Sequence, residues 1–187
     1  MFCRHRLTIS TIQQARSHYI AQLQNAARAA SPVHLEPALR TSDGSLALEG
    51  VLSLPFRPDL IPKAGGPSIM VDSTMRVPFD PWEHQVGSTR INVAPFIWDY
   101  VAVKLSGVAA ESDWDPLRQW FLRWFDTEDQ NPLNSEGFYG VVHFIADPEP
   151  IAGGSSITID LGSAPIECFE SLLGALLSLR PTLIEVA

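Results

Sequence analysis

Apolar residues recur every three, four or seven positions in three stretches of the chain, as on the buried face of a helix. The first stretch covers 10–30, the second begins at Asp115-Pro116, and the third follows Gly162 and ends before Pro181. An acid before a proline is typical of a helix start, and a proline past the last apolar position is typical of its end. The residues expected on the buried faces are Ile12, Tyr19, Leu23, Ala26 and Ala30, then Leu117, Trp120, Phe121 and Trp124, then Ile166, Phe169, Leu173 and Leu176.

Other stretches alternate apolar and polar residues or are short and apolar, which predicts β-strands. These stretches are 33–41, 45–56, 69–77, 89–105 with a bend at Pro95, 138–146, 156–161 and 182–186. Ser42-Asp43-Gly44 lies between the first two, and a glycine in such a turn predicts a β-hairpin. Prolines and glycines in 57–67 and 78–88 predict surface loops.

The predicted elements from residue 89 to the end follow the order β-α-β-β-α-β, the ferredoxin-like split βαβ arrangement. We therefore expect an α+β fold with an antiparallel or mixed sheet, extended by an N-terminal helix and a β-hairpin. A chain of 187 residues suits one domain, with residues 1–88 supplying the extension and 89–187 the βαββαβ unit. Because this order of elements hosts many unrelated activities, it does not predict a function.

Acidic residues are concentrated in one part of the chain. Residues 111–149 hold nine acids and two arginines, which accounts for −7 of the net formal charge of −8. Such a stretch repels phosphate groups and disfavours nucleic-acid binding; it either keeps the domain soluble or meets a basic protein. The candidate protein-binding residues are Asp113, Asp115, Asp126, Glu128, Asp129 and Glu136.

Cysteine content and hydropathy point to the cytoplasm. The apolar runs fall well short of the roughly 20 residues that cross a bilayer, so we expect no membrane association. Cys3 and Cys168 are too few for a secreted disulfide framework, which favours a reducing compartment. The first 35 residues carry arginines and no acid, a composition shared with mitochondrial transit peptides, but an amphipathic helix of the domain explains it better.

The densest polar group in the sequence is Asp80, Glu83 and His84, on the predicted loop 78–88. A carboxylate and an imidazole can serve as general base and orienting group, or as two metal ligands. Their spacing matches no zinc motif, and a solvated loop anchored by Trp82 is the simpler interpretation. We therefore expect no metal and no cofactor, and keep these three residues as a candidate ligand site.

Two further positions have a functional and a structural interpretation. Ser163 could help to hold an anion at a helix N-terminus, but serine is also a common N-cap, which we favour. Cys168 could form a nucleophilic pair with His143, but a buried cysteine is ordinarily a small apolar residue, so we expect no catalytic cysteine. The sequence contains no Gly-x-Ser-x-Gly, His-Glu-x-x-His or Cys-x-x-Cys motif.

Two hypotheses follow for the function. The first is a non-enzymatic protein-binding domain, of the adaptor, inhibitor or immunity type, that presents its acidic surface to a basic partner. The alternative is a small enzyme or small-ligand-binding domain with its site at Asp80, Glu83 and His84. Homo-oligomerisation is compatible with either hypothesis.

Overall fold

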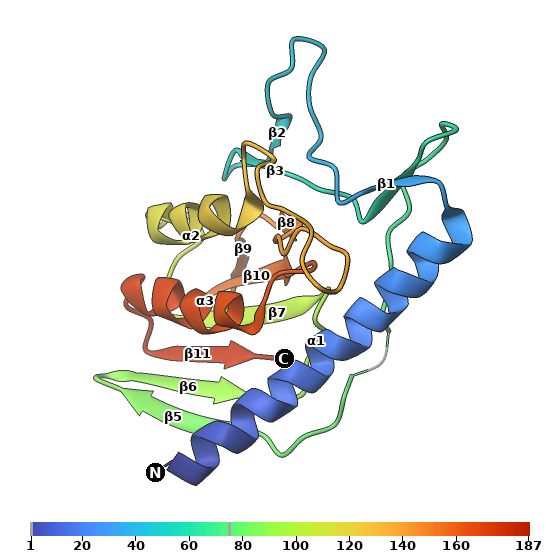
Figure 1. Cartoon of the computed structure of the whole chain (residues 1–187). Coiled ribbons are helices and arrows are strands. Elements are labelled where there is room, and N and C mark those ends of the chain that lie inside the picture. The colour runs from blue at the N-terminus through green and yellow to red at the C-terminus, as the bar shows by residue number, and fades with distance from the viewer. Residues whose placement is uncertain (1, 75) are drawn as a thin grey trace.

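A sheet of seven strands forms the centre of the molecule, with two helices packed side by side across it and a long N-terminal helix alongside (Figure 1). The computed structural model describes residues 2–74 and 76–187, and side chains from residue 11 onward. The helices are α1 (Phe2–Ala30), α2 (Asp115–Phe125) and α3 (Ile166–Ser178). The strands of the sheet are β5 (Trp82–Val86), β6 (Thr89–Val93), β7 (Val101–Ser106), β8 (Phe144–Ile145), β9 (Glu149–Ile151), β10 (Gly154–Asp160) and β11 (Leu183–Val186).

Strands far apart in sequence are neighbours in this sheet. Its order is β5-β6-β11-β7-β10-β8, and β9 also pairs with β10. Strand β11 runs parallel to β6, and the remaining pairs are antiparallel. The three helices and the mixed sheet confirm the predicted α+β class.

The N-terminal strands pair differently from the prediction. Strand β1 (Val33–Leu35) pairs with β4 (Leu60–Pro62), and β2 (Leu48–Glu49) pairs with β3 (Leu54–Pro55). The predicted hairpin of 33–41 with 45–56 is reduced to a single bridge between Arg40 and Leu46 around the Gly44 turn. The long-range pairing of β1 with β4 and a short hairpin of β2 with β3 therefore replace the pairing that the turn signal favours.

Three other strand predictions are wrong in extent, and one loop prediction is wrong. Residues 89–105 form two strands, because the chain leaves the sheet at Pro95, buries Phe96 and Trp98, and returns as β7 beyond β11. The predicted loop 78–88 contains β5, which is a mostly exposed edge strand and so lacks the alternation that marks a half-buried one. Of 138–146 only β8 is a strand, and 69–77 contributes one bridge at Ile69, with Met75 outside the described residues.

The helical faces agree closely with the prediction. Ile12, Tyr19 and Leu23 are buried on α1, and Leu117, Trp120 and Phe121 are buried on α2. At the ends of the stripes the burial shifts by one residue, because Phe125 is buried rather than Trp124, and Leu172 rather than Leu173. Phe169 of α3 stacks on Phe96 with ring centroids 5.1 Å apart, joining the helices to the segment between β6 and β7. None of the described helices is long and apolar enough to cross a membrane.

Candidate functional site

Asp80, Glu83 and His84 lie at the exposed edge of the sheet. All three side chains are exposed, and Glu83 and His84 are neighbours on β5, where consecutive side chains point to opposite faces. None of them lines either of the two pockets described below. The fold therefore does not bring these three groups together around a common point.

The acidic residues around α2 mostly have partners within the chain. The carboxylate of Asp113 accepts a hydrogen bond from the backbone N–H of Asp115, and Asp115 accepts one from the side chain of Gln119. Asp126 accepts bonds from two backbone N–H groups just beyond the end of α2. Glu128 is exposed and has no hydrogen bond or ion pair with another described residue. Most of these acids thus organise the ends of the helix.

Two of the predicted binding acids neutralise arginines. Asp129 lies 2.6 Å from Arg57, whose side chain is 2% exposed, and 2.7 Å from Arg40. Glu136 forms a two-pronged ion pair with the buried Arg16 of α1. These contacts lower the pKa of the Asp129 and Glu136 carboxyl groups. The charge of this stretch is therefore partly balanced inside the fold.

We predict that Asp129→Asn lowers the free energy of unfolding by about 1 kcal/mol, because it weakens a charge-assisted bond to Arg57 that is half open to solvent. Asparagine tolerates the positive φ of 52° at this position, so the substitution tests the charge rather than the backbone. The matched control is Glu128→Gln, which removes the same charge one residue away and should leave the urea midpoint nearly unchanged. Equal midpoints for the two variants would contradict a stabilising role for Asp129.

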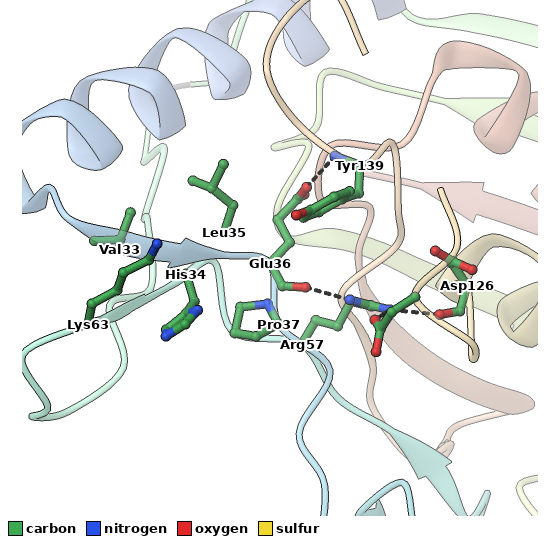
Figure 2. A pocket seen from close by; sticks show the side chains of 10 residues that line it. Val33, His34, Leu35, Glu36, Pro37, Arg57, Lys63, Asp126 and Tyr139 are labelled. Carbon is green, nitrogen blue, oxygen red and sulfur yellow. Dashed lines mark hydrogen bonds and ion pairs between the residues drawn. The ribbon is translucent and has the colours of Figure 1, made fainter. Parts of the chain in front are cut away.

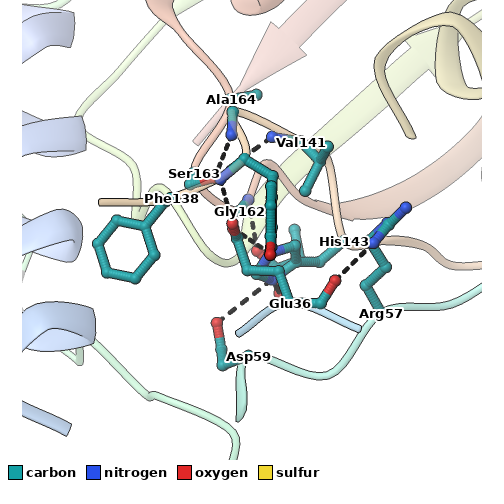
Figure 3. A network of polar contacts seen from close by, with 12 residues as sticks. Glu36, Arg57, Asp59, Phe138, Val141, His143, Gly162, Ser163 and Ala164 are labelled. Atoms are coloured by element: carbon teal, nitrogen blue, oxygen red, sulfur yellow. Dashed lines mark hydrogen bonds and ion pairs between the residues drawn. The ribbon is translucent and has the colours of Figure 1, made fainter. Parts of the chain in front are cut away.

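The largest group of buried titratable side chains surrounds His143 (Figure 3). Its Nε2 lies 2.8 Å from Glu36 Oε1, and its Nδ1 lies 3.2 Å from Asp59 Oδ1 and 3.6 Å from Asp160 Oδ2. The hydroxyl of Tyr19 donates a hydrogen bond to Asp59. These five residues, which we name the His143 cluster, join α1, the segments beside β1 and β4, the start of β8 and the end of β10.

Backbone N–H groups fix the orientation of each carboxylate in the His143 cluster. Glu36 accepts a bond from the N–H of Tyr139, Asp59 from that of Val71, and Asp160 from that of Gly162. The imidazole Nδ1 is the one nitrogen without an aligned hydrogen bond, although Asp59 is within ion-pair distance. The acids are therefore held in place by the backbone, around a ring that bridges them.

The charges of the His143 cluster shift one another's pKa values. Burial alone would lower the pKa of His143, but Asp160, Asp59 and Glu36 outweigh it and raise the pKa well above 6.5. Burial would raise the pKa of Asp59, but the bonds from His143 and Tyr19 lower it below 3.8. For Asp160 burial prevails over His143, and its pKa is raised. The surrounding acids thus favour the protonated form of the imidazole.

The arrangement of the His143 cluster suits an internal ion-pair network better than a reaction centre. The side chains of His143 and Glu36 are fully buried, so each group reaches another member of the cluster and not solvent. No group of three or more described ligand side chains is placed to hold a metal ion. The cluster therefore ties the N-terminal segments to β8 and β10. Two of its members line pockets, Glu36 the first and Asp160, which is 8% exposed, the second.

Among the described residues, no hydrogen bond joins Ser163 or Cys168 to His143. The hydroxyl of Ser163 accepts hydrogen bonds from the N–H groups of Gly140 and Val141, and Pro165 occupies the N-cap of α3, so the predicted N-cap role is wrong. Cys168 is buried, and burial raises its thiol pKa well above 9.0, which keeps it protonated. No hydrogen bond links Cys168 to His143 among the described residues.

A first pocket, of about 360 Å³, lies over the buried Arg57 (Figure 2). The guanidinium donates to the carbonyl groups of Glu36, Phe125 and Asp126 and to the carboxylate of Asp129, and it stacks over the Phe125 ring at 4.6 Å. Four of its five N–H donors are therefore used within the protein. The pocket is lined by Val33, His34, Leu35, Glu36, Pro37, Arg57, Lys63, Asp126, Asp129 and Tyr139.

A second pocket, of about 410 Å³, opens beside the start of β7. Three of its eight lining residues are aspartates and none is basic, while Met70 and Tyr100 are 48% and 59% exposed. We name it the acidic pocket; it is lined by Met70, Val71, Asp72, Thr74, Ile97, Asp99, Tyr100 and Asp160. Comparison with protein-family models, curated proteins and solved structures yields no match to this chain.

Proposed function

We propose that this chain is a non-enzymatic protein-binding domain, of the adaptor, inhibitor or immunity type, that recognises a basic partner. The observation that carries the proposal is the make-up of the acidic pocket, where two exposed apolar side chains border three carboxylates. Interfaces are enriched in tyrosine and methionine at the core and use complementary charge to steer association. The acidic pocket combines exposed methionine and tyrosine side chains with negative charge.

The proposed binding surface differs from the six acids that the sequence favours. Asp126, Asp129 and Glu136 have backbone or arginine partners within the chain, so a partner protein would have to compete for them. The carboxylates of the acidic pocket face no basic side chain in its lining. Carboxylates without a basic side chain in the same lining, next to exposed apolar area, support a surface centred on the acidic pocket.

We also infer that β7, α2, β8, β10, α3 and β11 form a split βαβ unit of the ferredoxin-like kind. The order β11-β7-β10-β8 and the antiparallel pairing of these strands support this interpretation. In this arrangement the acidic pocket lies where β7 begins and β10 ends, at one end of the two central strands. The alternative of an enzyme or ligand site at Asp80, Glu83 and His84 gains no support, because Glu83 and His84 point to opposite faces of β5 and Asp80 precedes that strand.

The proposal is tested by placing a photo-crosslinking amino acid at position 100 in cells that naturally produce the chain. We expect a protein partner to be captured from Tyr100 and not from Val86, a comparably exposed apolar position on the edge strand β5. The captured protein is then produced separately and mixed with the purified chain. A stoichiometric complex whose association slows with added salt is the expected result.

Two outcomes would contradict a protein-binding function on this face. One is crosslinking from position 100 no stronger than from position 86. The other is a purified captured protein that forms no complex with the chain, or binds Tyr100→Ala as tightly as the wild type. An exposed tyrosine at an interface centre usually contributes more than 1 kcal/mol, so a tenfold loss of affinity is expected for Tyr100→Ala.

A further inference from the structure

The lining of the acidic pocket holds three carboxylates and no basic side chain. Among the described residues only Asp160 of these three forms an ion pair, with the buried His143. Asp72 is exposed and has no hydrogen bond to another described residue. Asp99 is half-buried and accepts bonds from the backbone N–H and hydroxyl of Ser73, which leave part of its accepting capacity free. The carboxylates of the acidic pocket therefore favour a cationic occupant.

Asp160 makes this more than a group of surface acids. Its side chain is nine-tenths buried yet lines the pocket, and its Oδ1 accepts a bond from the N–H of Gly162. Its Oδ2 receives no hydrogen bond and lies 3.6 Å from His143 Nδ1, which itself lacks an aligned partner. A buried carboxylate oxygen with unused accepting capacity is costly unless something donates to it.

The walls of the acidic pocket select among cations. A metal ion is not favoured, because no three ligand side chains among the described residues are arranged to hold one. Met70 and Ile97 offer apolar surface to a hydrocarbon stem, and Tyr100 offers an aromatic ring to a flat cation. A guanidinium group is planar, donates two parallel bonds to a carboxylate and stacks flat on aromatic rings, whereas an ammonium is a compact point charge that cannot form the paired bonds or the flat stack.

We propose that the acidic pocket receives an arginine side chain of a partner protein, with its guanidinium at Asp160 and Asp72 and its stem along Met70 and Tyr100. This inference rests on the proposed protein-binding function and names the residue type that the surface recognises. Buried arginines paired with tyrosine and carboxylates are frequent centres of binding energy at interfaces. The partner therefore presents an exposed arginine on a convex segment.

The test uses the ¹⁵N-labelled chain and the tripeptide acetyl-Gly-Arg-Gly-amide, with citrulline and lysine versions as controls. Citrulline keeps the shape of arginine and removes its charge. We expect saturable shifts of the amide signals of 71–74 and 97–100, with a dissociation constant in the millimolar range, as befits one side chain. The citrulline peptide should bind at least about tenfold more weakly, a difference of 1.4 kcal/mol.

Variants locate the contact. Asp72→Asn removes an exposed carboxylate that supports no described hydrogen bond, so it should fold normally and weaken arginine binding several-fold. Glu128→Gln removes the same charge on another element and should leave the affinity unchanged. Asp160→Asn keeps an oxygen that can accept the bond from the Gly162 N–H. If this variant folds, it should weaken arginine binding more than Asp72→Asn does.

The inference is overturned if no saturable shift occurs, if citrulline or lysine binds as well as arginine, or if the shifts fall on residues 111–129. It is also overturned if Asp72→Asn abolishes self-association of the chain, because the occupant is then a second copy. Failure here with a partner still captured from position 100 leaves the proposed function standing. Arginine binding without any captured partner contradicts the proposed function, but the inference that the acidic pocket binds an arginine side chain then stands.

Discussion

Replacing His143 by glutamine should lower the free energy of unfolding by about 3–5 kcal/mol, because it removes the cation from a group of buried acids. Glutamine can donate to one carboxylate but cannot balance Glu36 and Asp59 together. Urea unfolding followed by tryptophan fluorescence measures the loss. The matched control is His84→Gln, which changes an exposed histidine on β5 and should leave the midpoint in place.

The pH dependence of the wild type tests the same cluster without any substitution. Because the pKa of His143 is raised in the folded state, the native chain holds a proton that the unfolded chain releases above 6.5. The stabilisation is complete below that pH and is lost as the pH rises toward the native value, by about 1.4 kcal/mol per pH unit. A stability that is flat or rises between pH 6.5 and the native pKa would contradict a buried imidazolium.

Asp59 acts in the opposite direction at acid pH. Its pKa lies below 3.8 in the folded chain, so its stabilisation is present above that value and is lost as the pH falls through the native pKa. The His143 cluster thus contributes most between these limits, where Asp59 is ionised and His143 is protonated. In the His143→Gln variant the alkaline loss should disappear.

Helices and central strands could be predicted from the sequence because their burial is one-sided and periodic. The stripes of α2 and α3 and the alternation of β10 each repeat with the period of their element, so burial in the structure follows them. Strand β5 could not be found in this way, since four of its five residues are exposed and impose no alternation. The pairing of β1 with β4 depends on contacts distant in sequence, which no local turn signal reports.

The His143 cluster was only partly visible in the sequence. A histidine within the apolar run Val141 to Ile145 is an unusual buried polar group, and that signal could have drawn attention to it. The acidic partners of His143 gave no such sequence signal, because Glu36, Asp59 and Asp160 lie in separate segments that only the fold brings together. The prediction that 57–67 is a surface loop is wrong at its start, since Arg57 and Asp59 are buried by the partners that satisfy them.

Gly162 is the backbone position that allows His143 to sit against the end of β10. It has a φ of 52°, a conformation that residues with a side chain rarely adopt, and its N–H is bound by Asp160. A Cβ at this position would lie 2.5 Å from the carbonyl oxygen of Val141 and 2.6 Å from His143 Nε2. Neither neighbour can move freely, because Val141 is buried and the imidazole is held between acids.

Gly162→Ala should therefore lower the free energy of unfolding by about 2–5 kcal/mol, the sum of the left-handed backbone cost and of overpacking. Because the methyl group displaces the imidazole from Glu36, the loss of stability with rising pH should also become shallower than in the wild type. The control is Gly174→Ala on α3, where a Cβ meets nothing within 4 Å and helix propensity favours alanine by about 1 kcal/mol. Urea unfolding at several pH values measures both effects. A Gly162→Ala chain with the stability and pH slope of the wild type would show that the ring does not depend on this close approach.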